Sequence, residues 1–119
     1  MDPKEIKYSK SITLEVTVAD NLLVGYIEEE ISSQKRNPNR RQIYGRLTDF
    51  RPTFKDSIDI SSGLGDTNNN ILSLTGINFN DSGHFKFTIA VDGKEPEIKV
   101  NENLEAYTSK SWAYKLVKV

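Results

Sequence analysis

The sequence contains no cysteine. This absence excludes structural disulfides, thiolate zinc sites and cysteine nucleophiles. Histidine is nearly absent as well, because His84 is the only one, and we place it on the outward side of a strand. A catalytic triad or a multi-histidine metal site would therefore lack its members. We predict no catalytic residues, no metal site and no cofactor.

Long apolar runs are also missing. No segment approaches the roughly 20 residues that cross a bilayer, and Met1 to Glu5 lack the basic and then apolar pattern of a secretory signal. The formal net charge is −1 and the isoelectric point is about 5.8, so no bulk charge attracts nucleic acid or anionic lipid. We expect no membrane contact and a cytoplasmic protein, or a virion component assembled in the cytoplasm. The 119 residues fit a single domain spanning 1–119, with no linker inside it.

The strongest pattern that is present has a period of two residues. Apolar side chains alternate with polar ones from Ile12 to Val18, and again from Phe85 to Val91. Such alternation is typical of a strand with one buried face. Asp92-Gly93 has the composition of a type I′ turn, after which Ile98 and Val100 continue the alternation. A hairpin alone is marginal in water, so a second layer must cover its apolar face.

Further strands are predicted at intervals of about ten residues. Leu22–Ile27 is either a strand or part of a short helix that continues through Ile31, and we favour the strand. Ile43–Phe50 is predicted as a strand with Ile43, Gly45 and Leu47 on one side. Brief alternation marks 56–60, and the last strand, 111–119, has Trp112, Tyr114 and Leu116 on a shared side.

Polar segments separate these strands. Ser32–Arg41 contains no apolar residue, and Ser61–Asn70 has two glycines and three consecutive asparagines, so both are predicted to be solvated loops. Asn101–Lys110 is polar and irregular, with Leu104 and Tyr107 as the expected anchors. The predicted fold is all-β, an antiparallel, immunoglobulin-like β-sandwich of about 7–9 strands.

The segment 72–87 is similar to the E-to-F strand signature of immunoglobulin variable-type domains. The residues that carry the resemblance are Leu72, Leu74, Ile77, Asp81, Gly83, Phe85 and Phe87. Phe85 stands where the corner tyrosine would be and Phe87 where the second cysteine would be. Residues 11–16 likewise resemble the B strand, with Val16 at the first cysteine. The resemblance implies two facing layers, with Val16 and Phe87 where a disulfide would join them.

Residues 72–100 also look like the C-terminal half of a group of small, uncharacterised, cysteine-free bacterial proteins. The shared pattern includes Gly76, Phe79 and the Asp92-Gly93 turn. This resemblance implies a β-sandwich and a bacterial or phage setting. Both resemblances consist of packing residues and transfer no functional site.

One basic cluster stands out from an otherwise balanced surface. It comprises Lys35, Arg36, Arg40, Arg41, Arg46 and Arg51, interspersed with Tyr44, Phe50 and Phe54. Arginine beside exposed aromatic rings can bind phosphate and stack on bases, but such loops also dock on acidic protein surfaces or only keep a protein in solution.

Three hypotheses of function follow. The leading one is a non-catalytic protein-interaction or structural assembly module that contacts another protein or copies of itself. The second is a small module that binds single-stranded nucleic acid through the basic cluster. The third is a carbohydrate-binding module that uses Trp112, Tyr114 or Tyr107.

Overall fold

The structure is a computed structural model that describes residues 4–32, 35–36, 40–48, 54–61, 64, 69–79, 81 and 83–119. These residues form nine strands of four or more residues and a two-residue strand, β4. The strands are β1 (Lys4–Tyr8), β2 (Ile12–Ala19), β3 (Asn21–Ser32), β4 (Lys35–Arg36), β5 (Arg41–Thr48), β6 (Asp56–Asp59), β7 (Asn69–Ile77), β8 (His84–Val91), β9 (Pro96–Asn103) and β10 (Ser109–Lys118). Among the described residues, no helix has the length and apolarity needed to span a membrane.

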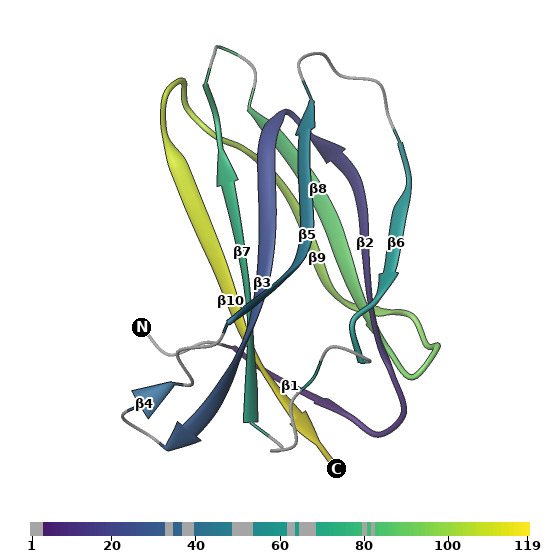
Figure 1. Cartoon of the computed structure of the whole chain (residues 1–119). Helices are drawn as coiled ribbons and strands as arrows, with labels where there is room; N and C mark the ends of the chain where they lie inside the picture. Colours follow the sequence, from purple (N-terminus) through teal and green to yellow (C-terminus); the bar gives the residue numbers. More distant parts are fainter. Residues whose placement is uncertain are drawn as a thin grey trace.

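The strands pair into two sheets that pack face to face (Figure 1). The six-stranded sheet has the order β1-β10-β7-β3-β4, with β5 also paired to β3, and the four-stranded sheet has the order β6-β2-β8-β9. Every pairing is antiparallel except that of β1 with β10, which is parallel. The predicted all-β sandwich is confirmed.

The interior is built from the alternating residues that the sequence placed inside. Phe85, Phe87 and Ile89 of β8 are fully buried, as are the inward residues of β2. Trp112 of β10 covers them from the other sheet, with its ring centroid 5.3 Å from that of Phe87 at an interplanar angle of 81°. This edge-to-face geometry is one that aromatic pairs favour. The predicted inward faces of β8 and β10 are therefore confirmed, and so is that of β2 up to Val16. The register shifts between Val16 and Val18, so Ala19 is buried, whereas Val18, which was predicted to face inward, is only half-buried.

The hairpin turn adopts the backbone that its sequence predicted. Asp92 has φ 53° and Gly93 has φ 72°, the two positive values that a type I′ turn requires. Lys94 N–H donates to the Val91 carbonyl at 3.0 Å, which closes the turn. The return strand β9 starts at Pro96, and its register against β8 shifts between Ile89 and Ala90, where Glu97 has no partner in the pairing.

Val16 and Phe87 do not face each other across the sandwich. They are direct partners on the neighbouring strands β2 and β8, within the four-stranded sheet. The immunoglobulin disulfide joins strands that belong to opposite sheets. Val16 and Phe87 therefore do not occupy the positions of the immunoglobulin disulfide, as the resemblance in sequence implied.

Several local predictions are corrected. The helical alternative for Leu22–Ile27 is wrong, since β3 is a continuous strand from Asn21 to Ser32. Ile43 does not share a side with Leu47: the register omits Ile43 where β5 pairs with Gly25 and Tyr26, so its side chain packs on the core, whereas Leu47 is 65% exposed. A bulge of this kind reverses the alternation that a sequence pattern assumes.

The predicted loops are shorter than expected. Residues 35–36 form β4, which pairs with β3, and Arg41 already belongs to β5. Asn69 and Asn70 begin β7, and Asn70 is fully buried. Tyr107 is 79% exposed and does not anchor its segment, whereas Leu104 packs against the core as predicted. The predicted strand residues Asp49 and Phe50 lie outside the described residues.

Candidate functional site

The predicted basic cluster is divided between two surfaces. Arg40 lies beside the six-stranded sheet, with its guanidinium 4.3 Å from the centre of the Tyr26 ring and 3.5 Å from a carboxylate oxygen of Glu28. Arg46 lies instead at the seam between β5 and β6, where the two sheets meet. Lys35 and Arg36 are placed in β4, Arg41 starts β5, and Arg51 lies outside the described residues.

Arg46 takes part in a cluster that joins the two sheets. Its Nη1 lies 3.1 Å from Oδ2 of Asp56, and its guanidinium stacks 3.8 Å from the centre of the Phe54 ring. Tyr44 also donates its hydroxyl to Asp56, at 2.6 Å. Burial, followed by the bond to Asp56, raises the pKa of the Tyr44 phenol far above its usual range. We call Tyr44, Arg46, Phe54 and Asp56 the β5–β6 clasp.

A second polar group joins the sheets at the opposite seam. Glu102 of β9 accepts hydrogen bonds from Lys110 and, at 2.8 Å, from the indole N–H of Trp112, both on β10. These bonds from Lys110 and Trp112 lower the pKa of Glu102. Burial, with the nearby Glu102 charge, raises the pKa of Tyr114 to about 12. Tyr114 therefore remains a neutral hydroxyl at physiological pH.

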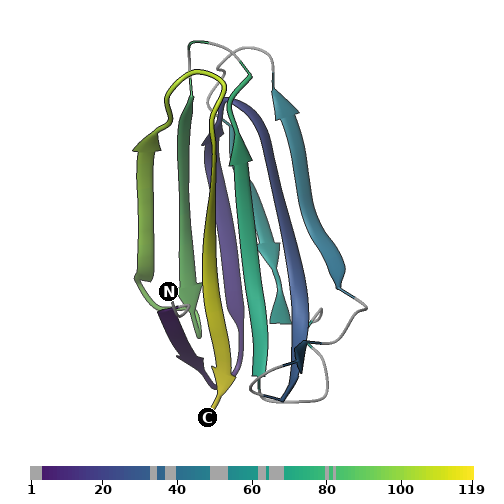
Figure 2. The same ribbon diagram turned by 90° about the vertical axis from the view of Figure 1, so that its left-hand side faces the viewer.

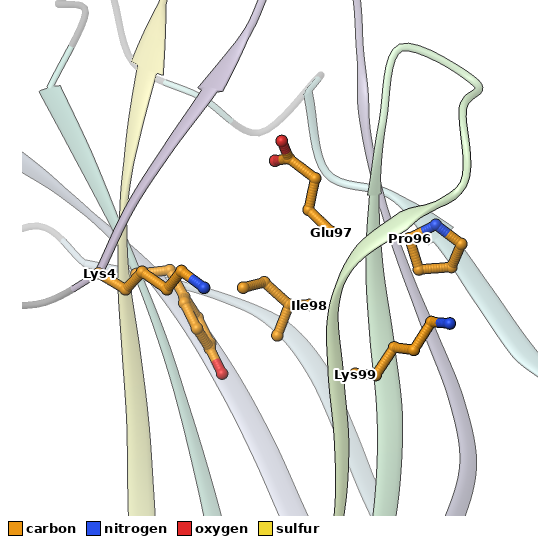
Figure 3. A pocket seen from close by; sticks show the side chains of 6 residues that line it. Lys4, Pro96, Glu97, Ile98 and Lys99 are labelled. Atoms are coloured by element: carbon orange, nitrogen blue, oxygen red, sulfur yellow. The ribbon is translucent and has the colours of Figure 1, made fainter.

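Next to this group lies a cavity of about 480 Å³ between β1 and β10 on one side and β9 on the other (Figure 3). Its lining residues are Lys4, Pro96, Glu97, Ile98, Lys99 and Tyr114. The lining thus combines two lysines and one glutamate with Ile98, Pro96 and Tyr114. No sequence pattern indicates this cavity, because its walls come from segments about 90 and 110 residues apart, which only the topology brings together.

The Asp92 carboxylate binds the turn between β1 and β2. Its Oδ1 accepts backbone N–H groups from Lys10 at 2.6 Å and Ser11 at 3.0 Å, and its oxygens also accept the N–H and hydroxyl of Ser9. The N–H groups of Lys10 and Ser11 hold the pKa of Asp92 well below its usual range. This carboxylate is a structural anion rather than a candidate proton acceptor.

Buried amides hold the other end of the sandwich together. Asn78 accepts a hydrogen bond from Asn21 at 3.0 Å and donates to the carbonyls of Leu104 and Glu105. Gly83 fits against this group only because it has no side chain: a Cβ there would lie 2.5 Å from Asn78 Nδ2 and 2.6 Å from the Leu104 carbonyl oxygen. No sequence pattern singles out Asn78, since an asparagine before a polar loop looks like a solvated residue.

His84 is bonded to the neighbouring strand, its Nε2 contacting Oδ1 of Asn101. No group of three or more His, Asp or Glu side chains in the described part of the chain is arranged to hold a metal ion. Every buried side-chain N or O atom that the structure describes has a hydrogen-bond partner. The polar groups described above thus hold loops and sheets in place.

Comparison with known proteins returns nothing: no family model, curated protein or solved structure matches this chain.

Proposed function

We propose that this protein is a non-catalytic protein-interaction or assembly module of bacterial or phage type. The observation that supports it is the edge of β9, which, among the strands that the structure describes, pairs only with β8 and ends the four-stranded sheet. An edge strand presents unpaired backbone N–H and C=O groups that another strand can bind. In contrast, the carboxylates of Asp56, Asp92 and Glu102 are already engaged within the fold.

The nucleic-acid alternative has weaker support. Arg40 and Arg46 each pair with a carboxylate and stack on an aromatic ring of their own chain. A phosphate or a base would have to displace those contacts first. For the carbohydrate alternative, Trp112 and Tyr114 are only 7% and 6% exposed, so these two rings offer no platform to a sugar.

Photo-crosslinking in the native organism tests the proposal. A photoreactive phenylalanine analogue replaces Lys99 on β9 in one strain, and Lys86 on the neighbouring strand β8 in a control strain. We expect a discrete crosslinked adduct, either with another protein or with a second copy of the chain, from position 99 and none from position 86. The absence of adducts at position 99 would count against the proposal.

A binding assay distinguishes the nucleic-acid alternative from the proposed interaction function. If single-stranded oligonucleotides bind with a salt-dependent affinity that is lost when Arg36, Arg40, Arg41 and Arg46 become alanine, the nucleic-acid function replaces the proposed one.

A further inference from the structure

Two edge strands of opposite sheets meet at the cavity described above. Among the strands that the structure describes, β1 ends the six-stranded sheet and β9 ends the four-stranded one. Figure 2 shows β1, drawn in dark purple, just below the start of β9, drawn in yellow-green. Residues of both strands line the cavity, so it lies at the seam between the two sheets.

Lys4 brings a positive charge to the inward side of β1. Alternate residues of a strand lie on one face, and the row that starts at Lys4 continues with Ile6 and Tyr8, which are both buried. In the parallel register Lys4 lies beside Tyr114 of β10, and both residues line the cavity. The Lys4 ammonium is therefore directed to the cavity side of the six-stranded sheet.

A bulge brings a negative charge to the same cavity. The register of β9 against β8 shifts at Glu97, which has no partner in the pairing. Such a bulge changes the direction in which a side chain points. In Figure 3, Glu97 and Ile98 extend to the side of β9 that faces β1, whereas Lys99 extends to the other side. The cavity thus lies between a lysine on one sheet and a glutamate on the other.

These two charges do not neutralise each other. Among the residues that the structure describes, neither the Lys4 ammonium nor the Glu97 carboxylate takes part in an ion pair or a hydrogen bond. The cavity that both residues line has a volume of about 480 Å³, within the range of about 300–1,000 Å³ that is typical of small-molecule pockets. A ligand of that size can contact both charges.

Tyr114 adds a hydroxyl without a partner. The residue is only 6% exposed, yet its hydroxyl makes no hydrogen bond within the described part of the chain. Every fully buried side-chain N or O atom there does have a partner, so this hydroxyl stays accessible, and the residue lines the cavity. Because burial and the Glu102 charge raise the pKa of Tyr114 to about 12, the hydroxyl is a neutral donor at physiological pH.

We propose that this cavity binds a free α-amino acid with an apolar side chain. The carboxylate of the amino acid binds the Lys4 ammonium and the Tyr114 hydroxyl, its ammonium binds Glu97, and its side chain packs on Ile98. A purely anionic ligand would be repelled by Glu97 and a purely cationic one by Lys4, whereas a zwitterion is attracted by both. This small-molecule site is additional to the interaction function proposed above and does not depend on it.

An NMR titration of the full, ¹⁵N-labelled chain tests the site. L-Leucine is compared with N-acetyl-L-leucine, L-leucinamide and glycine, which lack the ammonium, the carboxylate and the apolar side chain, respectively. We expect saturable shifts of the amide signals at residues 4, 97–99 and 114 with L-leucine. Each comparison ligand loses one kind of contact and should bind about tenfold more weakly.

Substitutions assign each contact. Glu97→Gln should remove the preference for L-leucine over N-acetyl-L-leucine, and Lys4→Met should remove the preference over L-leucinamide. Tyr114→Phe keeps the ring and should weaken the binding of L-leucine several-fold. The matched control is Lys99→Met, at the lining lysine whose side chain extends to the other side of β9, and it should leave the affinity unchanged. Circular dichroism of each variant verifies that it is folded.

Each outcome decides the inference. Charges that only protect the two edge strands from pairing would give no saturable binding at millimolar L-leucine, and this result would overturn the proposal. Binding of N-acetyl-L-leucine or L-leucinamide as tight as that of L-leucine would also overturn it, because the site would then take an anion or a cation. Shift changes confined to other parts of the chain, or equal effects of Lys4→Met and Lys99→Met, would contradict the assigned site.

Discussion

At the scale of single residues, the backbone and the side chain of Asp92 fix different parts of the fold. The backbone, with its positive φ, turns β8 toward β9. The carboxylate accepts N–H groups from the turn between β1 and β2, more than 80 positions away in the sequence. One residue thus connects a hairpin of the four-stranded sheet to the β1–β2 turn, where the chain passes from the six-stranded sheet to the four-stranded one.

We predict that Asp92→Asn lowers the free energy of unfolding at neutral pH and that the difference from the wild type disappears in acid. Asparagine tolerates a positive φ, so the substitution tests the carboxylate alone. The pKa of Asp92 is lower in the folded than in the unfolded chain, so its stabilisation is present at neutral pH. It is lost as the pH falls below about 4, toward the folded-state pKa.

Urea unfolding at a series of pH values measures this difference. The control is Asp81→Asn, at an exposed position, which should change the free energy of unfolding by less than about 0.5 kcal/mol. A difference for Asp92→Asn that stays constant down to acid pH would show that the charge is not responsible.

At the scale of secondary-structure elements, the β8–β9 hairpin depends on the second turn residue. Gly93 has φ 72°, and a Cβ added there would meet no atom within 4 Å. We predict that Gly93→Val destabilises the protein by about 1–3 kcal/mol through backbone strain alone. Thermal and urea unfolding give the measurement.

Two matched variants separate strain from other effects. Gly93→Asn should recover much of the loss, because asparagine adopts this conformation more readily than a β-branched residue. Lys94→Val, at the next and exposed position, should have little effect. A loss for Lys94→Val as large as that for Gly93→Val would mean that the turn is not the cause.

Elements with clean alternation could be predicted from the sequence, and those with irregular pairing could not. The inward faces of β8 and β10, and that of β2 up to Val16, follow directly from residues such as Leu14, Phe87 and Trp112. The bulge at Ile43 could not be foreseen, because it arises from pairing with β3 rather than from the composition of β5.

Polar contacts between residues far apart in the sequence could not be predicted from the sequence either. Asp92 was predicted for its turn conformation, but its bonds to Lys10 and Ser11 depend on the topology. The basic cluster was recognised as a group of neighbours in sequence, although the fold separates Arg40 from Arg46. The β9 edge could be located only once the strand order was known.

At the scale of the whole molecule, the two sheets share one interior in which aromatic rings from both sides meet. Phe87 is fully buried and its ring packs on Trp112 of the other sheet. Removing that ring therefore weakens the attachment of both layers, and not only of β8.

We predict that Phe87→Ala lowers the free energy of unfolding by about 3–5 kcal/mol, a large share of the about 5–15 kcal/mol that a domain typically has. The fluorescence of Trp112, the only tryptophan, reports unfolding directly. Lys86→Ala, at the adjacent exposed position, should change stability by less than about 0.5 kcal/mol. An unchanged melting temperature for Phe87→Ala would contradict the assigned interior.

The parallel pairing of β1 with β10 also constrains the order of events during protein synthesis. Lys4 lies opposite Tyr114 and Tyr8 opposite Lys118, so β1 joins its sheet through β10, which is synthesised after all the other strands that the structure describes. A nascent chain must keep β1 without that partner while eight other strands emerge. The six-stranded sheet is thereby completed only after β10 has been synthesised, and a ribosome that stalls before β10 would leave β1 without its partner strand.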